Sequence, residues 1–198
     1  MKLSDFATRE ELSSAVRGRP RDSQRSKLYS AENRLTFEAE LCPNVGWSQR
    51  WRRTFHTMTE YTGRVREIQR SRWWEENVDG LDVQPLDGRG GQARARWAMM
   101  EIRIPKDLRT NSIIIHELAH LAVHYRHRED SIEQRIAGHG WQFAETYLSM
   151  VSRFIGEEAA KNLRRQFREN RVRYRAPKPK RELTEAQRSA LVARLRGQ

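Results

Sequence analysis

One short segment gathers residues that could bind a metal ion and hydrolyse a bond. His116, Glu117 and His120 read H-E-L-A-H within an otherwise apolar stretch. On a helix, the i, i+4 spacing places both imidazoles one turn apart on the same face, where they can bind one zinc ion. Glu117 directly follows the first histidine, so its carboxylate can reach a water molecule at the metal and act as a general base. We therefore predict that this segment binds zinc and supports hydrolysis.

The residues around this motif make the prediction stronger. Apolar side chains cover most of the circumference of the helix expected over residues 110–127, which is typical of a helix buried on nearly every side. Three ionisable side chains buried in such a helix cost several kcal/mol unless each finds a partner. A divalent metal ion would be that partner. Core histidines satisfied by hydrogen bonds within the protein are the alternative explanation.

A zinc site needs a third protein ligand, and two residues are candidates for it. The metzincin pattern is excluded, because Val123 and Arg126 occupy the places of its glycine and third histidine. His139 is the best candidate, since the loop 126–138 can bring it back across the motif and its flanking glycines allow a close backbone approach. Glu145, in the helix that follows, is the alternative third ligand.

The elements that must position these residues predict an α+β fold. Apolar residues at helical spacing, together with helix-forming composition, predict helices over residues 21–33, 46–62, 110–127, 139–155 and 157–170. Alternating or β-rich segments predict strands over residues 64–69, 81–86 and 94–104. We expect a small antiparallel or mixed sheet with helices packed on it.

Length and composition indicate one soluble domain with appendages. The chain has 198 residues, of which 37% are hydrophobic and 32% are charged. No apolar run approaches the roughly 20 residues that span a bilayer, so neither membrane insertion nor classical secretion is expected. Cys42 is the single cysteine, which excludes an internal disulfide and a multi-cysteine zinc site. A reducing cytoplasm, in a bacterium or a phage-infected cell, fits this composition.

Most of the positive charge lies at the C-terminal end. Residues 161–198 hold 13 Lys and Arg residues against three Asp and Glu residues, and therefore carry +10 of the net charge of +12. Such a tail can contact DNA or RNA without sequence preference, although a merely solvated end is the alternative. The cations expected to bind nucleic acid are Arg171, Arg173, Arg175, Lys178, Lys180 and Arg181.

The same charge pattern suggests four segments. We expect a flexible N-terminal segment over residues 1–20 and the main domain over residues 21–170. A basic, proline-containing linker follows over residues 171–182. A short amphipathic helix, with a capping box at its start, is predicted over residues 183–198.

Two motifs together resemble a known family. H-E-L-A-H followed by H-G-W-Q-F resembles the SprT-like zincin peptidases, in which HExxH and a downstream HGxxF/W supply three histidines to zinc. With the segment R-D-S-Q-R-S-K-L-Y over residues 21–29, the chain is more closely similar to small actinobacterial and actinophage HExxH metallohydrolases. The resemblance covers about residues 21–170. Many SprT-like proteins carry a four-cysteine zinc ribbon after the core, whereas this chain has the basic linker and helix in that place.

The resemblance implies a zincin-like core with a defined site. It implies zinc at His116, His120 and His139, Glu117 as the catalytic base, and a substrate that lies along an edge strand within residues 98–104. The function predicted is that of a zinc metallopeptidase acting on a peptide or protein substrate.

Two points stay open at the level of sequence. Tyr125, Tyr147 and Arg96 are all candidates to stabilise the oxyanion, and the sequence does not choose among them. The alternative functions are a nucleic-acid-associated protein and a virion structural protein, each with a vestigial or structural zincin core. A structural site has no use for a base beside its metal, so the presence of Glu117 favours the enzyme.

Overall fold

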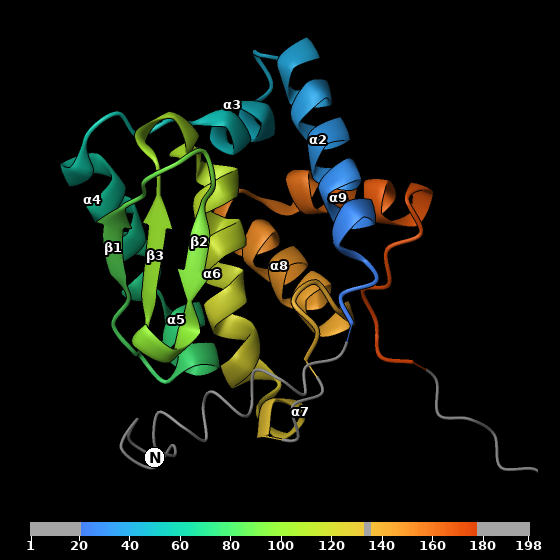
Figure 1. The fold of residues 1–198 in the computed structure, drawn as a ribbon. Coiled ribbons are helices and arrows are strands. Elements are labelled where there is room, and N and C mark those ends of the chain that lie inside the picture. The colour runs from blue at the N-terminus through green and yellow to red at the C-terminus, as the bar shows by residue number, and fades with distance from the viewer. Residues whose placement is uncertain (1–20, 133–135, 178–198) are drawn as a thin grey trace, which may run out of the picture.

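The computed structural model describes residues 21–132 and 136–177, in which helices lie against one face of a small sheet (Figure 1). The elements in chain order are α2 (Arg25–Leu41), α3 (Gly46–Arg52), α4 (Met58–Gln69), α5 (Arg72–Val78), β1 (Gln84–Asp87), β2 (Arg94–Arg96), β3 (Glu101–Ile104), α6 (Asn111–Arg126), α7 (Arg128–Ile132), α8 (Trp141–Phe154) and α9 (Glu157–Glu169). The fold is α+β, as predicted. Within the described ranges, no helix combines the length and the apolar character needed to cross a membrane.

The sheet has three strands, and its central strand comes last in the chain. The strand order is β1-β3-β2, with β1 parallel and β2 antiparallel to β3. Strand alternation buries Ile102 and Ile104 completely and leaves Arg103 exposed on the opposite face. The core of the domain therefore lies between the sheet and the helices behind it.

The predicted strand over residues 94–104 is wrong as a single strand. Its two halves are β2 and β3, separated by a turn in which Met100 adopts a positive φ of 47°. Because β3 pairs on both sides, residues 98–104 do not provide the edge strand that the family resemblance implies. β2 is the edge strand that lies beside α6.

A local cap changes the predicted structure of residues 46–69. A helix over 46–62 and a strand over 64–69 were expected, but α3 and α4 occupy this stretch instead. The Thr57 hydroxyl accepts a hydrogen bond from the Glu60 backbone N–H, and the Glu60 side chain bonds back in a capping box, so a new helix begins here. The residues that α4 buries at helical spacing are Tyr61, Val65 and Ile68.

The H-E-L-A-H segment lies on α6, the helix at the centre of the molecule. The Thr110 hydroxyl caps this helix by accepting a hydrogen bond from the Ile113 backbone N–H. As predicted, α6 is buried on nearly every side, because the sheet covers one side and α8 and α5 pack along others.

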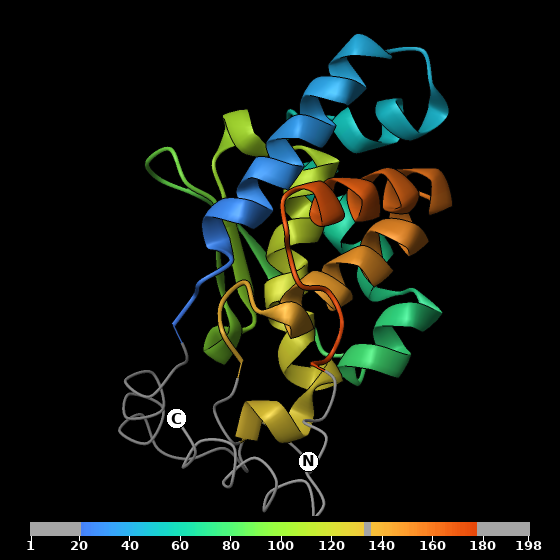
Figure 2. The same cartoon turned by 90° about the vertical axis from the view of Figure 1, so that its right-hand side faces the viewer.

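Helix α2 lies across from the sheet, on the other side of α6 (Figures 1 and 2). One face of α2 is buried, through Leu28, Ala31, Leu35 and Ala39. Its packing against α9 includes polar contacts, since the Glu38 carboxylate accepts hydrogen bonds from Arg165 at 2.6 Å and from Gln166 at 2.7 Å. The helix predicted over residues 21–33 begins later, at Arg25, and extends further, to Leu41.

The packed domain continues past residue 170, into the predicted basic linker. Val172 is buried, and the Tyr174 ring packs against Phe167. Arg171, Arg173 and Arg175 are exposed.

Several predictions fall on residues that the structure does not describe. Lys178, Lys180, Arg181, the helix over 183–198 and the segment 1–20 lie outside the described residues. Nucleic-acid contact through the tail therefore stays a prediction.

Candidate metal centre

Helix α6 places two histidine side chains side by side. His116 and His120 are one turn apart, and their ring centroids are 4.9 Å from each other. The two Nε2 atoms face each other at 3.2 Å. Both nitrogens can therefore turn to a common point, as the i, i+4 spacing predicts.

The turn before α8 completes a group of three histidines. His139 lies between two glycines just ahead of Trp141, the first residue of α8. The potential ligand atoms of His116, His120 and His139 all lie within 4.8 Å of one another, which is close enough for the three to hold one metal ion. The sequence prediction that these three residues come together is confirmed.

Two carboxylates fix the orientation of two of the rings. The Nδ1–H of His116 donates to Glu32 Oε1 at 2.7 Å, and the Nδ1–H of His139 donates to Asp22 Oδ2 at 2.6 Å. In the neutral form of each ring, a proton on Nδ1 leaves the lone pair on Nε2. A carboxylate behind a metal-binding imidazole is the usual support of metal sites in proteins.

A buried nitrogen without a hydrogen-bond partner is evidence that this group fits a metal ion. His139 Nε2 is buried and has no hydrogen-bond partner, although buried polar atoms nearly always have one. A metal ion bound by His116, His120 and His139 would satisfy that lone pair. Three imidazoles with supporting carboxylates are a donor set suited to a divalent transition metal, zinc among them.

The charges of the three rings also suit metal binding. Burial lowers the pKa of His120 well below its ordinary value, and His116 and His139 lower it further. Burial also lowers the pKa of His139, with Asp22 acting in the opposite direction. Burial alone would lower the pKa of His116 as well, but the Glu32 carboxylate outweighs it and raises that pKa. Metal ions bind the neutral imidazole, which is the form that His120 and His139 favour.

The phenylalanine of H-G-W-Q-F packs against all three histidines. The Phe143 ring centroid lies 4.3 Å from that of His120, in a stacked arrangement, and 5.0 Å from those of both His116 and His139. Phe143 is fully buried. The Phe143 ring therefore restricts the movement of all three imidazole rings.

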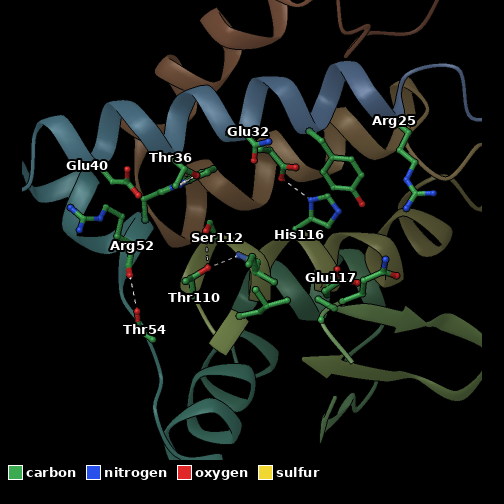
Figure 3. A pocket seen from close by; sticks show the side chains of 18 residues that line it. Arg25, Glu32, Thr36, Glu40, Arg52, Thr54, Thr110, Ser112, His116 and Glu117 are labelled. Atoms are coloured by element: carbon green, nitrogen blue, oxygen red, sulfur yellow. Dashed lines mark hydrogen bonds and ion pairs between the residues drawn. The ribbon is translucent and has the colours of Figure 1, made fainter. Parts of the chain in front are cut away.

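A cleft of about 660 Å³ opens beside these residues, between α2 on one side and α6 with the segment 91–93 on the other (Figure 3). His116 and Glu117 both line it. Glu117 is 7% exposed, and burial raises the pKa of its carboxyl, with His116 acting in the opposite direction. The site therefore places a carboxyl group with a raised proton affinity next to the histidine cluster.

The alternative third ligand has other partners. Glu145 forms an ion pair with Arg126 at 2.6 Å, and its second oxygen lies 3.3 Å from His127 Nε2. Both carboxylate oxygens are thus engaged away from the histidine cluster. The structure favours His139 over Glu145 as the third member.

None of the three candidates for oxyanion stabilisation lines the cleft. Tyr147 is fully buried, Tyr125 directs its hydroxyl to Met100 Sδ at 3.8 Å, and Arg96 pairs with Glu101 at 2.8 Å.

Sequence reasoning missed the three residues that α2 and the segment before it supply, namely Asp22, Glu32 and Tyr29. Asp22 and Tyr29 belong to the segment 21–29 that carries part of the family resemblance, which was the one available signal. Burial raises the pKa of Tyr29, and Glu32 adds to that effect.

A side-chain amide connects the metal centre to the end of the described chain. Gln24 Nε2 donates to the His139 carbonyl at 3.2 Å and to the Arg173 carbonyl at 3.4 Å. The Arg173 backbone N–H donates back to Gln24 Oε1. The turn that carries His139 is therefore held by residues from both ends of the domain.

Comparison of the chain with protein-family models, with curated proteins and with solved structures gave no match. The likeness to SprT-like peptidases rests on the motif residues alone and stays a prediction.

Proposed function

We propose that the protein is a zinc-dependent hydrolase that cleaves peptide bonds. One observation carries the proposal: three imidazoles converge with a buried, partnerless Nε2 among them, and Glu117 lines the open cleft beside them. A structural metal site would not need a carboxyl group of raised pKa facing a cleft.

His116, His120 and His139 would hold the metal ion. When bound, it would polarise a substrate carbonyl and make a water molecule more acidic. Glu117 accepts a proton from the attacking water and passes it to the leaving nitrogen. Its raised pKa suits this exchange, because the carboxyl must both take up and release a proton near neutral pH.

The cleft favours an extended chain as substrate. β2 is an edge strand of the sheet, and residues 91–93 directly before it line the cleft. An unpaired strand edge can hold a peptide through main-chain hydrogen bonds. An extended peptide lying between β2 and α2 would pass the histidine cluster.

The test separates chemistry from metal binding. Glu117→Gln should keep the metal ion and the fold but lose turnover by at least about a hundredfold, because a positioned general base is removed. Glu40→Gln is the matched control, since Glu40 lines the same cleft away from the histidines, and its effect should stay under about tenfold.

The measurement is mass-spectrometric mapping of products from a peptide library, with metal content determined on each variant. Cleavage by Glu117→Gln at the wild-type rate would contradict the proposed mechanism. Absence of any cleavage by the metal-loaded wild-type protein would contradict the proposed function.

A further inference from the structure

Tyr29 is the one tyrosine of the described chain that lines the cleft. It lies on α2, whereas Glu117 lies on α6, and its side chain is 37% exposed. Its ring stacks on His116 with centroids 5.6 Å apart and planes at 15°, and it lies 5.1 Å from the His139 ring. The phenol is therefore in contact with two of the three imidazoles and with the open space of the cleft.

A neighbouring cation lies close to this ring. The Arg25 guanidinium, one turn earlier on α2, is 5.7 Å from the centroid of the Tyr29 ring. Arg25 also lines the cleft, so this part of the α2 wall presents an O–H donor and a positive charge together. Both groups favour a negative charge that develops nearby.

We propose that the Tyr29 hydroxyl donates a hydrogen bond to the substrate carbonyl oxygen as that oxygen becomes negative. The inference rests on the proposed function and adds a catalytic residue to it. It also chooses Tyr29 over Tyr125, Tyr147 and Arg96, because Tyr29 lines the cleft together with Glu117 and those three residues do not.

The proposed step balances without further reactants. The water oxygen forms a bond to the carbonyl carbon while Glu117 takes one water proton, and the π electrons move to the carbonyl oxygen. Tyr29 donates a hydrogen bond to that oxygen and keeps its proton. When the carbonyl re-forms, the C–N bond breaks and Glu117 returns its proton to the leaving nitrogen.

A purely structural role would need only the aromatic ring. Tyr29→Phe keeps the stack on His116 and removes the hydroxyl, so it separates the two roles. Tyr125→Phe is the matched control, because it removes a hydroxyl that bonds to Met100 outside the cleft. Metal content should equal that of the wild type in both variants.

The kinetic measurement asks whether the substitution changes kcat or KM. Loss of one oxyanion donor lowers kcat by about 100-fold or more, so we expect that loss in Tyr29→Phe with KM changed by less than about threefold. Tyr125→Phe should keep the wild-type kcat. An unchanged kcat in Tyr29→Phe, in a protein whose Glu117→Gln variant is inactive, would overturn this inference and leave the proposed function standing.

A binding readout does not depend on turnover. A phosphinic dipeptide carries a tetrahedral, negatively charged centre, and its affinity for the metal-loaded protein can be measured by calorimetry. Tyr29→Phe should bind it about 30-fold to 100-fold more weakly than the wild type, while Tyr125→Phe should not differ. Equal binding by wild type and Tyr29→Phe, or no binding by the wild type, would overturn the inference even if no peptide substrate is found.

Discussion

The two walls of the cleft contribute in different ways to the histidine cluster. The α6 wall supplies two of the three histidines from a helix that is buried on nearly every side. The α2 wall supplies Glu32 and Tyr29 from a helix with a single buried face, and its attachment to α9 includes hydrogen bonds and an ion pair. The two ligands on α6 therefore rest on a helix packed on nearly every side, whereas Glu32 and Tyr29 rest on a helix packed along one apolar face, with polar contacts to α9 added.

This difference means that the cluster can be weakened in steps. A change on α6 or at His139 removes a candidate ligand, whereas a change on α2 or in the segment before it leaves all three imidazoles in place but less well oriented. Substitution of a ligand should therefore lower metal affinity most. Substitution of a supporting carboxylate should lower it less, and substitution of Gly138, which leaves space for the Asp22 carboxylate, should lower it least.

The largest effect is expected at a ligand. His139→Ala should abolish stoichiometric metal binding, since two imidazoles and water hold a divalent ion far less firmly than three imidazoles. Glu145→Ala should keep the metal, because Glu145 pairs with Arg126 and His127. Elemental analysis of the purified variants, with circular dichroism to check the fold, measures both. A normal metal content in His139→Ala would show that the cluster is not the site.

A smaller effect is expected at the supporting carboxylates. Asp22→Asn and Glu32→Gln should each weaken metal affinity by about 10-fold to 100-fold, the usual result of removing the partner of a metal-binding histidine. The two losses should not simply add in free energy, because the two imidazoles that these carboxylates orient lie 5.5 Å apart and belong to one candidate metal site. Competition with a chromophoric chelator gives the affinities.

Glu40→Gln, on the same helix as Glu32, is the control for this pair and should keep the wild-type metal affinity. If Asp22→Asn and Glu32→Gln also kept it, the α2 wall would have no part in metal binding, and the contrast between the walls would disappear.

The smallest effect is expected at a glycine beside Asp22. A Cβ at Gly138 would lie 3.0 Å from Asp22 Oδ2, so Gly138→Ala must shift the carboxylate that orients His139. We expect a loss of metal affinity of about threefold to tenfold, below that of Asp22→Asn. Gly63→Ala is the control, because a Cβ there meets nothing within 4 Å and the residue lies within α4. A wild-type affinity in Gly138→Ala would mean that Asp22 can move without disturbing His139.

The ligands could be predicted from sequence because their signals are local. The spacing of His116 and His120 fixes their relation on any helix, and the glycines around His139 mark a close approach of the backbone. Glu117 needed only its place next to His116. The apolar surroundings of the motif correctly predicted a helix that is buried on nearly every side.

The supports could not be predicted in the same way, because their partners are far away in the chain. Glu32 meets His116 across 84 positions and Asp22 meets His139 across 117. Nothing in the sequence around Glu32 marks it out among the acidic residues, and Asp22 has only its place in the segment 21–29 that carries part of the family resemblance. Only the tertiary structure identifies them, by placing α2 and the segment before it beside His116 and His139.

The errors in secondary structure have an equally local cause. Residues 64–69 carry the β-branched Val65 and Ile68, which favour a strand, but these two residues are three positions apart, as on a helix, and the capping box at Thr57 starts a helix that includes them. The apolar stripe that predicted one helix over 46–62 is divided by the same cap, so Trp51 and Tyr61 enter the core from two helices.

The hydrogen bonds of Gln24 join residues that are synthesised at very different times. A ribosome makes the chain from the N-terminus, so Asp22, Gln24 and Glu32 emerge early and His139 emerges late. Gln24 has its full set of hydrogen bonds only when Arg173 is present. In a nascent chain that ends before residue 173, Gln24 can still donate to the His139 carbonyl but lacks its two hydrogen bonds with Arg173. The segment that carries His139 would therefore gain the last of the hydrogen bonds that position Gln24 beside it only after residue 173 has been synthesised.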